Sequence, residues 1–172
     1  MTVGTLKPRT ALVLAIDPGT TSGLALLKLD LADEGRPSSV WCDQLPWLEA
    51  AAAVESRVAQ MKWALETGTA ERAAVVAEKF TVNPQTASKG QQGIEDAIGL
   101  RGVARQRCAA TELEYDGSQS ASSAKSLVKD DVLRGLGLYA RGMKHVCDAY
   151  RHAVLYAVRS GLMASRYLLE RR

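Results

Sequence analysis

The first part of the chain alternates short apolar runs with polar turns, and this pattern predicts β-strands. Residues 11–16 are all apolar and stop at an Asp-Pro-Gly turn signal, which indicates a buried strand. A second apolar run covers residues 23–29. Polar residues with Gly and Pro at 31–39 predict a loop, and residues 40–45 predict a third strand. Three strands joined by short turns are typical of an antiparallel meander.

The second part of the chain alternates helical and strand-like patterns. Apolar residues recur with a helical period over residues 46–67 and stop at Gly68, whereas residues 73–77 predict a buried strand that ends at Glu78. The remaining elements follow in order: an exposed loop at 81–93, a helix at 94–109, a strand at 112–115, a small-polar linker at 118–123, and helices at 124–136 and 145–169. The order β-β-β-α-β-α-β-α-α is that of the RNase H-like fold. We therefore expect an α/β protein with a mixed five-stranded sheet flanked by helices.

Length and composition fit an ordinary globular chain. The 172 residues suit one domain with a single core. No apolar run is long enough to span a bilayer, and the polar start lacks the apolar core of a signal peptide. We therefore expect a cytosolic protein with no membrane contact, whose residues 1–10 form a flexible leader. Three widely spaced cysteines, Cys42, Cys108 and Cys147, argue against a zinc site and against a disulfide framework.

Positive charge is concentrated toward the C-terminus. The net charge is only +3, but residues 116–172 carry ten Lys or Arg against five Asp or Glu, whereas residues 1–115 carry twelve against fourteen. A basic C-terminal third suits a polyanion such as nucleic acid. Charge alone favours the simpler explanation, a solvated helical face.

Acidic residues end two of the predicted buried strands. Asp17 follows the first strand, and Glu78 ends the strand at 73–77. A single strand-end carboxylate most often caps the strand or faces water. If the two strands lie parallel and adjacent, however, both acids emerge at the same sheet edge, where open α/β sheets place their active sites. Two close carboxylates repel each other, and a divalent cation relieves that repulsion.

A third polar group lies near the C-terminus and contains the only two histidines of the chain. In a helix, His145 and Asp148 are three residues apart and Asp148 and His152 are four apart, so all three share one face. A single histidine there would indicate packing or a polar surface stripe. Three such residues on one face of an otherwise apolar helix favour a cluster of metal ligands.

Three motifs, in order, resemble those of the RuvC family of Holliday-junction resolvases. Ala-Ile-Asp-Pro-Gly at 15–19 with Gly23 resembles the first motif, a strand followed by Asp-Pro-Gly and a hairpin glycine. Val-Val-Ala-Glu-Lys-Phe at 75–80 resembles the second, a strand that ends in Glu and precedes an aromatic residue. His-Val-Cys-Asp-Ala at 145–149 resembles the last motif, and Arg-His-Ala at 151–153 is similar to phage RuvC-like proteins. The resemblance covers most of the chain and implies an endonuclease of a bacterial cytosol or a phage-infected host.

The resemblance also implies a two-metal site. Asp17 would bridge two Mg²⁺ ions, Glu78 would hold one of them, and Asp148 with His145 would hold the other. The product would carry a 5′-phosphate and a 3′-hydroxyl. Histidine is a softer ligand than carboxylate and would favour Mn²⁺ over Mg²⁺. For His152, a role in supporting a ligand and a packing role are equally open.

Three further residues are candidates for contacts with DNA. A lysine in the corresponding region of RuvC proteins approaches the phosphate, and either Lys125 or Lys129 would match it, although a solvated lysine is nearly as good an explanation. Phe80 follows Glu78 by two residues, closer than the usual resolvase spacing, so stacking on a junction base and packing within the loop both stay open. Six other basic residues would also suit phosphates, and no spacing distinguishes any of them: Arg101, Arg105, Arg134, Arg141, Lys144 and Arg151.

Three other functions compete with this interpretation. An actin-type kinase or ATPase has a similar phosphate loop, Asp-x-Gly-Thr-Thr, but it needs a second lobe with a second such loop; one domain of 172 residues leaves no room for that lobe, and Asp-x-Gly-Thr-Thr does not recur. A non-catalytic branched-DNA-binding module would lack one of the acidic positions, all of which are filled here. A nuclease for flaps, replication forks or RNA–DNA hybrids is a third alternative, which the sequence leaves open. For a four-way junction we expect a homodimer, because two-fold symmetry places one site on each of two strands.

Overall fold

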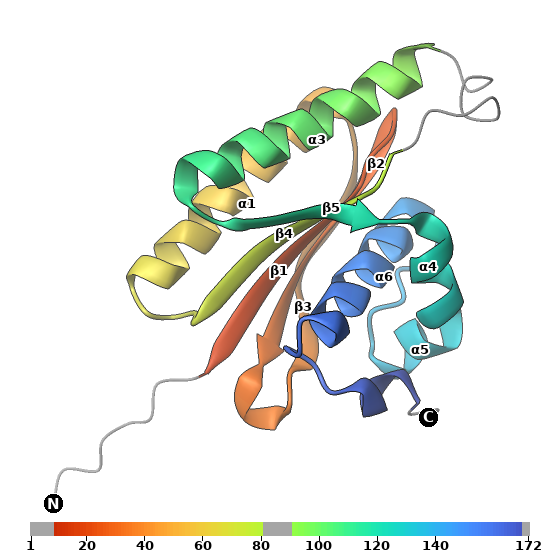
Figure 1. The fold of residues 1–172 in the computed structure, drawn as a ribbon. Coiled ribbons are helices and arrows are strands. Elements are labelled where there is room, and N and C mark those ends of the chain that lie inside the picture. The colour runs from red at the N-terminus through yellow and green to blue at the C-terminus, as the bar shows by residue number, and fades with distance from the viewer. Residues whose placement is uncertain (1–8, 81–90, 170–172) are drawn as a thin grey trace, which may run out of the picture.

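A five-stranded sheet forms the centre of the structure, a computed structural model that describes residues 9–80 and 91–169 (Figure 1). The strand order is β3-β2-β1-β4-β5. The strands are β1 (Thr10–Asp17), β2 (Thr21–Asp30), β3 (Arg36–Pro46), β4 (Arg72–Glu78) and β5 (Glu114–Gln119). The first three form the predicted antiparallel meander, whereas β4 pairs in parallel with both β1 and β5. The mixed five-stranded sheet predicted from the sequence is confirmed.

Helices cover both faces of this sheet (Figure 1). On one face lie α1 (Trp47–Glu66) and α3 (Gln91–Thr111). On the other face lie α4 (Ala121–Leu127), α5 (Asp130–Gly135) and α6 (Lys144–Arg159). Two short 3-10 helices, Leu31–Asp33 and Ser165–Leu168, complete the described elements. Among the helices in this part of the chain, none combines the length and apolar character needed to cross a membrane.

The period of two along β1 divides its side chains between the two helical layers. Val13 and Ala15 join the core beneath α6, whereas Leu14 and Ile16 join the core beneath α1 and α3. Asp17 is the next residue on the α6 side. The strand therefore delivers its terminal carboxylate to the face that α6 covers.

The strands β1 and β4 end side by side. Ile16 pairs with Ala77 in the parallel register, so Asp17 and Glu78 come directly after paired positions. In β4, Val76 belongs to the core beneath α6, so Glu78, two residues later, faces the same layer as Asp17. The parallel, adjacent arrangement on which the predicted acidic site depends is thus present.

Two strands are longer than the sequence pattern predicts. β3 begins at Arg36 and takes up half of the predicted loop at 31–39, because Ser38 and Ser39 pair with β2. These side chains are exposed at the edge of the sheet, so the strand has no apolar pattern there. β5 extends to Gln119, into the predicted linker, because its polar second half still pairs with β4.

Two predicted helices are wrong in extent. The helix predicted at 124–136 is split into α4 and α5, and the second helix starts with Asp130 and Asp131, whose charges favour a helix N-terminus. The helix predicted at 145–169 corresponds to α6 and a separate 3-10 turn. Its interruption follows from Gly161, whose φ of 70° lies in the left-handed region that ends helices.

Two further expectations fall partly outside the described residues. Thr10, which falls within the predicted leader, is buried in β1, and the residues before Arg9 lie outside the described part of the chain. The end of the loop predicted at 81–93 belongs to α3. The rest of that loop also lies outside the described residues.

Gly23 is the point at which β2 and α6 come closest. It pairs with Asp17 in the antiparallel register. A Cβ built on Gly23 would lie 2.0 Å from both the backbone C and the backbone O of His145. The absence of a side chain at this position therefore permits α6 to begin directly against the sheet, beside Asp17.

Replacing Gly23 with alanine is expected to force α6 away from β2. Because the clash is with backbone atoms, the free energy of unfolding should fall by about 2–3 kcal/mol, as urea denaturation would measure. Gly102→Ala in α3 is the matched control, since a Cβ there meets nothing within 4 Å and alanine is the better helix former. Equal stability of Gly23→Ala and the wild type would contradict this close approach.

Candidate active site

One pocket is lined by the acidic residues that the sequence predicts as metal ligands. It has a volume of about 570 Å³ and opens where β1 and β4 end and α6 begins. Asp17, Glu78, His145 and Asp148 all line it. Two strands and one helix, distant in sequence, thus bring the four predicted metal ligands together.

Asp17 is buried at the end of β1 and is hydrogen-bonded to a histidine. Nδ1 of His145 lies 2.7 Å from Oδ2 of Asp17. Burial raises the pKa of Asp17 to about 6; the His145 contact lowers it, and the neighbouring carboxylates of Glu78 and Asp148 raise it. The same hydrogen bond raises the pKa of His145. Asp17 therefore lies among like charges and depends on an imidazole partner.

Glu78 is supported from the protein interior by His152. Nε2 of His152 lies 3.4 Å from Oε2 of Glu78, and its Nδ1 lies 3.3 Å from Oε1 of Gln119 at the end of β5. The His152 residue is only 1% exposed. Burial by itself raises the pKa of Glu78, but hydrogen bonds with His152 and Asp17 and the positive charges nearby outweigh it, so the pKa is lowered. Of the two roles left open for His152, its geometry matches support of a carboxylate.

Asp148 is paired with two basic side chains. Its Oδ2 lies 3.1 Å from Nζ of Lys125 in α4, and its Oδ1 accepts a hydrogen bond of 2.5 Å from Nη1 of Arg151. Arg151 also donates to Asp130 and to the backbone carbonyl of Val128. Both oxygens of the Asp148 carboxylate are therefore already engaged.

Two pairings differ from the expectations. His145 contacts Asp17 rather than joining Asp148, because Gly23 brings the start of α6 against the sheet beside Asp17. Arg151, one of the six basic residues that would also suit phosphates, turns inward to Asp148 and is mostly buried. The spacing of three residues between Asp148 and Arg151 is the sequence signal that predicts this pair. No comparable signal marks Gln119, which falls in a polar stretch.

The donor chemistry of the pocket fits a hard divalent cation. Carboxylate oxygens suit Mg²⁺, and imidazole also suits Mn²⁺. A cation would also relieve the repulsion that the neighbouring carboxylates exert on Asp17. Within residues 9–80 and 91–169, however, no three Asp, Glu, His or Cys side chains are arranged around one point as a metal site, and each acid contacts a basic partner. Metal binding would therefore require some of these partners to yield.

The residues predicted to contact DNA lie in or beside the same pocket. Lys125 lines it through its contact with Asp148, and Phe80 also lines it. Lys129 lies in an adjoining hollow, together with Lys144 and Arg151. Lysine charge thus extends from the acids along the neighbouring surface.

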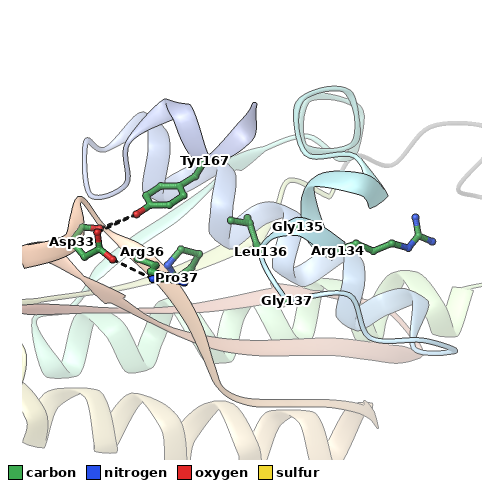
Figure 2. Close-up of a pocket in the computed structure, with 8 residues that line it drawn as sticks. All are labelled: Asp33, Arg36, Pro37, Arg134, Gly135, Leu136, Gly137 and Tyr167. Atoms are coloured by element: carbon green, nitrogen blue, oxygen red, sulfur yellow. Dashed lines mark hydrogen bonds and ion pairs between the residues drawn. The ribbon is translucent and has the colours of Figure 1, made fainter. Parts of the chain in front are cut away.

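A second hollow, of about 590 Å³, lies between the start of β3 and the end of α5 (Figure 2). Arg36 is 3.6 Å from the carboxylate of Asp33, and the hydroxyl of Tyr167 donates to the Asp33 carbonyl at 3.1 Å. Figure 2 shows that Arg134 points away from these residues, and it stacks on Tyr139. This hollow is lined by one acidic residue, whereas the pocket at the ends of β1 and β4 is lined by three, so it is the weaker candidate for metal binding.

No family model and no curated protein matches the sequence, but solved structures match its fold. The chain is similar to RuvC of Thermus thermophilus, with a TM-score of 0.55 and 22% identity, covering 87% of this chain and 96% of that one. It is also similar to T. thermophilus RuvC in complex with a Holliday junction substrate, with a TM-score of 0.51 and 20% identity, covering 88% and 96%. For the yeast mitochondrial Holliday junction resolvase the TM-score is 0.50 and the identity 12%, covering 96% and 82%. The chain has the RNase H-like fold of these resolvases.

Replacing Asp17 with asparagine removes a buried charge that also lies close to two other carboxylates, so the metal-free variant should be more stable than the wild type. An acid whose pKa is raised from 3.8 to about 6 binds more protons in the folded state, so its contribution to stability is present at low pH and is lost as the pH rises toward 6. The advantage of Asp17→Asn should be small near pH 4 and reach roughly 1–3 kcal/mol, or several degrees in Tm, above pH 7.

Calorimetry in the presence of a chelator measures this difference. Asp131→Asn is the matched control, because Asp131 is an exposed acid on α5. This control should show no gain that grows with pH. Loss of stability in Asp17→Asn at high pH would mean that the His145 contact, and not repulsion, dominates at Asp17.

Proposed function

We propose that this protein is a metal-dependent endonuclease that cuts branched DNA, with four-way junctions as its principal substrate. The observation that carries the proposal is the gathering of Asp17, Glu78 and Asp148 in one pocket, at the ends of two parallel strands and on the helix that covers them. The fold shared with solved resolvases supports the same class of reaction.

Asp17, Glu78, Asp148 and His145 would hold two Mg²⁺ ions, or Mn²⁺ in their place. Bound divalent ions lower the pKa of an attacking water and stabilise the charge on the oxygen that leaves a phosphodiester. The hydrolysed strand would then carry a 5′-phosphate and a 3′-hydroxyl.

The protein's own side chains would prepare this site before DNA arrives. Nδ1 of His145 orients the carboxylate of Asp17, and Nε2 of His152 orients that of Glu78. Neighbours that orient metal ligands by hydrogen bonds typically contribute tenfold to a hundredfold in affinity or activity. The buried setting of Asp17 also limits competition from water.

Positive charge beside the acids suits the DNA backbone. Lys125, Lys129 and Lys144 lie in the pocket or in the adjoining hollow, within reach of a phosphodiester chain that enters it. Phe80 lines the same pocket and offers an aromatic face to an unpaired base at a branch point. A homodimer would present two such sites to the two strands that must be cut symmetrically.

A cleavage assay tests the proposal. Labelled four-way junction, flap and linear duplex are incubated with the wild type, Asp17→Asn and Glu78→Gln, in Mg²⁺, in Mn²⁺ and in chelator. The wild type should nick two opposing strands of the junction, only with metal, and leave ends that a ligase reseals. Each variant should lose at least about a hundredfold in rate, because even the neighbours of metal ligands contribute that much.

Glu71→Gln is the matched control. Glu71 lies directly before β4, at the end of the strand away from Glu78, and pairs with Arg9 on the surface. Its loss should therefore leave the cleavage rate unchanged. If only flaps are cleaved, the protein is a nuclease with a different substrate. If the nicks in the junction are not paired on opposing strands, the homodimer is contradicted. Junction binding without cleavage in either metal would instead assign the protein to non-catalytic branched-DNA binding.

A further inference from the structure

Arg151 is a buried arginine whose three guanidinium nitrogens are all engaged. Nη1 donates to Asp148, Nη2 to Asp130, and Nε to the carbonyl of Val128 at 3.0 Å. Only 11% of the side chain is exposed. A planar fork held by three acceptors cannot turn away from one of them without weakening the others. Arg151 therefore fixes Oδ1 of Asp148 rigidly.

Lys125 holds the other oxygen of the same carboxylate much less firmly. Its Nζ is 3.1 Å from Oδ2 of Asp148, but 48% of the lysine side chain is exposed. A half-exposed ammonium on a flexible stem loses little when it exchanges its partner for water. The two oxygens of Asp148 thus differ: one has a fixed partner, and the other has a partner that is able to leave.

The connector between α4 and α5 is what fixes Arg151. Helical geometry stops at Val128, whose φ of −109° and ψ of 84° leave its carbonyl available to Nε of Arg151. Asp130 then opens α5 and accepts from Nη2. The interruption between the two helices, which the sequence pattern does not predict, therefore provides two of the three acceptors that hold the guanidinium.

Asp130 also balances charge. A guanidinium in contact with Asp148 would repel a cation bound to that carboxylate. The second carboxylate offsets the positive charge, so the three side chains of Asp148, Arg151 and Asp130 together carry a formal charge of −1. Oδ2 of Asp130 also lies 3.8 Å from Nη2 of the exposed Arg134. Asp130 is about half exposed and does not line the pocket that holds the three acids.

We propose that Arg151 is the positioning residue for Asp148 and that Asp130 is the anchor that balances its charge. The inference rests on the proposed function, in which Asp148 holds a divalent ion. Arg151 orients the carboxylate through Oδ1, and Lys125 gives up Oδ2 to the metal. Asp130 keeps the guanidinium in place and prevents its charge from weakening metal binding.

Binding of Mn²⁺, followed by electron paramagnetic resonance without DNA, tests the anchor independently of activity. Asp130→Asn keeps the shape of the side chain and removes its charge, so the dissociation constant for Mn²⁺ should rise about tenfold. Asp131→Asn makes the same change at the next residue of the same helical turn, where the carboxylate accepts from the backbone N–H of Val132. This matched control should bind Mn²⁺ as the wild type does.

Arg151→Lys tests whether the planar guanidinium is needed to position Asp148. Lysine keeps the positive charge but cannot donate to three fixed acceptors in the geometry of a guanidinium. The single-turnover rate of junction cleavage at saturating Mn²⁺ should therefore fall about tenfold to a hundredfold, with a smaller change in Mn²⁺ affinity. A wild-type rate would overturn the positioning role. If circular dichroism shows that this buried variant does not fold, Mn²⁺ binding by Asp130→Asn decides the question.

The wild type separates this inference from the proposed function. If the wild type binds Mn²⁺ and Asp130→Asn binds it equally well, the inference is overturned and the proposed function stands. If the wild type binds no Mn²⁺, both are overturned. Weaker binding by Asp130→Asn, with Asp131→Asn unchanged, supports the anchor.

Discussion

Repulsion among three carboxylates at one edge of the sheet is the constraint on which the rest of the site depends. The pKa of Asp17 is raised first by burial and then by the neighbouring carboxylates of Glu78 and Asp148. Helix α6 supplies each acid with a basic partner, in the pairs His145–Asp17, His152–Glu78 and Arg151–Asp148. Lys125 adds a fourth partner, from α4. These partners permit the acids to cluster in a folded, metal-free protein, and a divalent cation would compete with some of them for the same oxygens.

The backbone sets this arrangement before any side chain acts. Alternation along β1 and β4 turns Asp17 and Glu78 toward the layer of α6, and the parallel register ends the two strands together. Gly23 then removes the side chain that would hold α6 away from the sheet. Glycine at that one position in β2 therefore governs the distance between the strand-end acids and their partners on the helix.

Much of this site is predictable from local patterns, and the rest depends on tertiary contacts. An apolar run that stops at a carboxylate marks Asp17, and helical spacing groups His145 with Asp148. The pairing of Lys125 with Asp148 has no local signal, because the two residues lie on different helices. The same holds for the contacts of Arg151, because the interruption between helices α4 and α5 falls within a stretch that has a helical sequence pattern. The first part of the edge strand β3, residues 36–39, escapes prediction because most of its side chains face solvent rather than a core.

The basic partners of the three acids occupy carboxylate oxygens that a metal would take. Anomalous diffraction from crystals soaked in Mn²⁺ tests this most directly. We expect anomalous density about 2.0–2.3 Å from oxygens of Asp17, Glu78 and Asp148, with Nζ of Lys125 withdrawn from Asp148. Saturating Mn²⁺ that leaves this pocket without density, with Lys125 still 3.1 Å from Asp148, would contradict it.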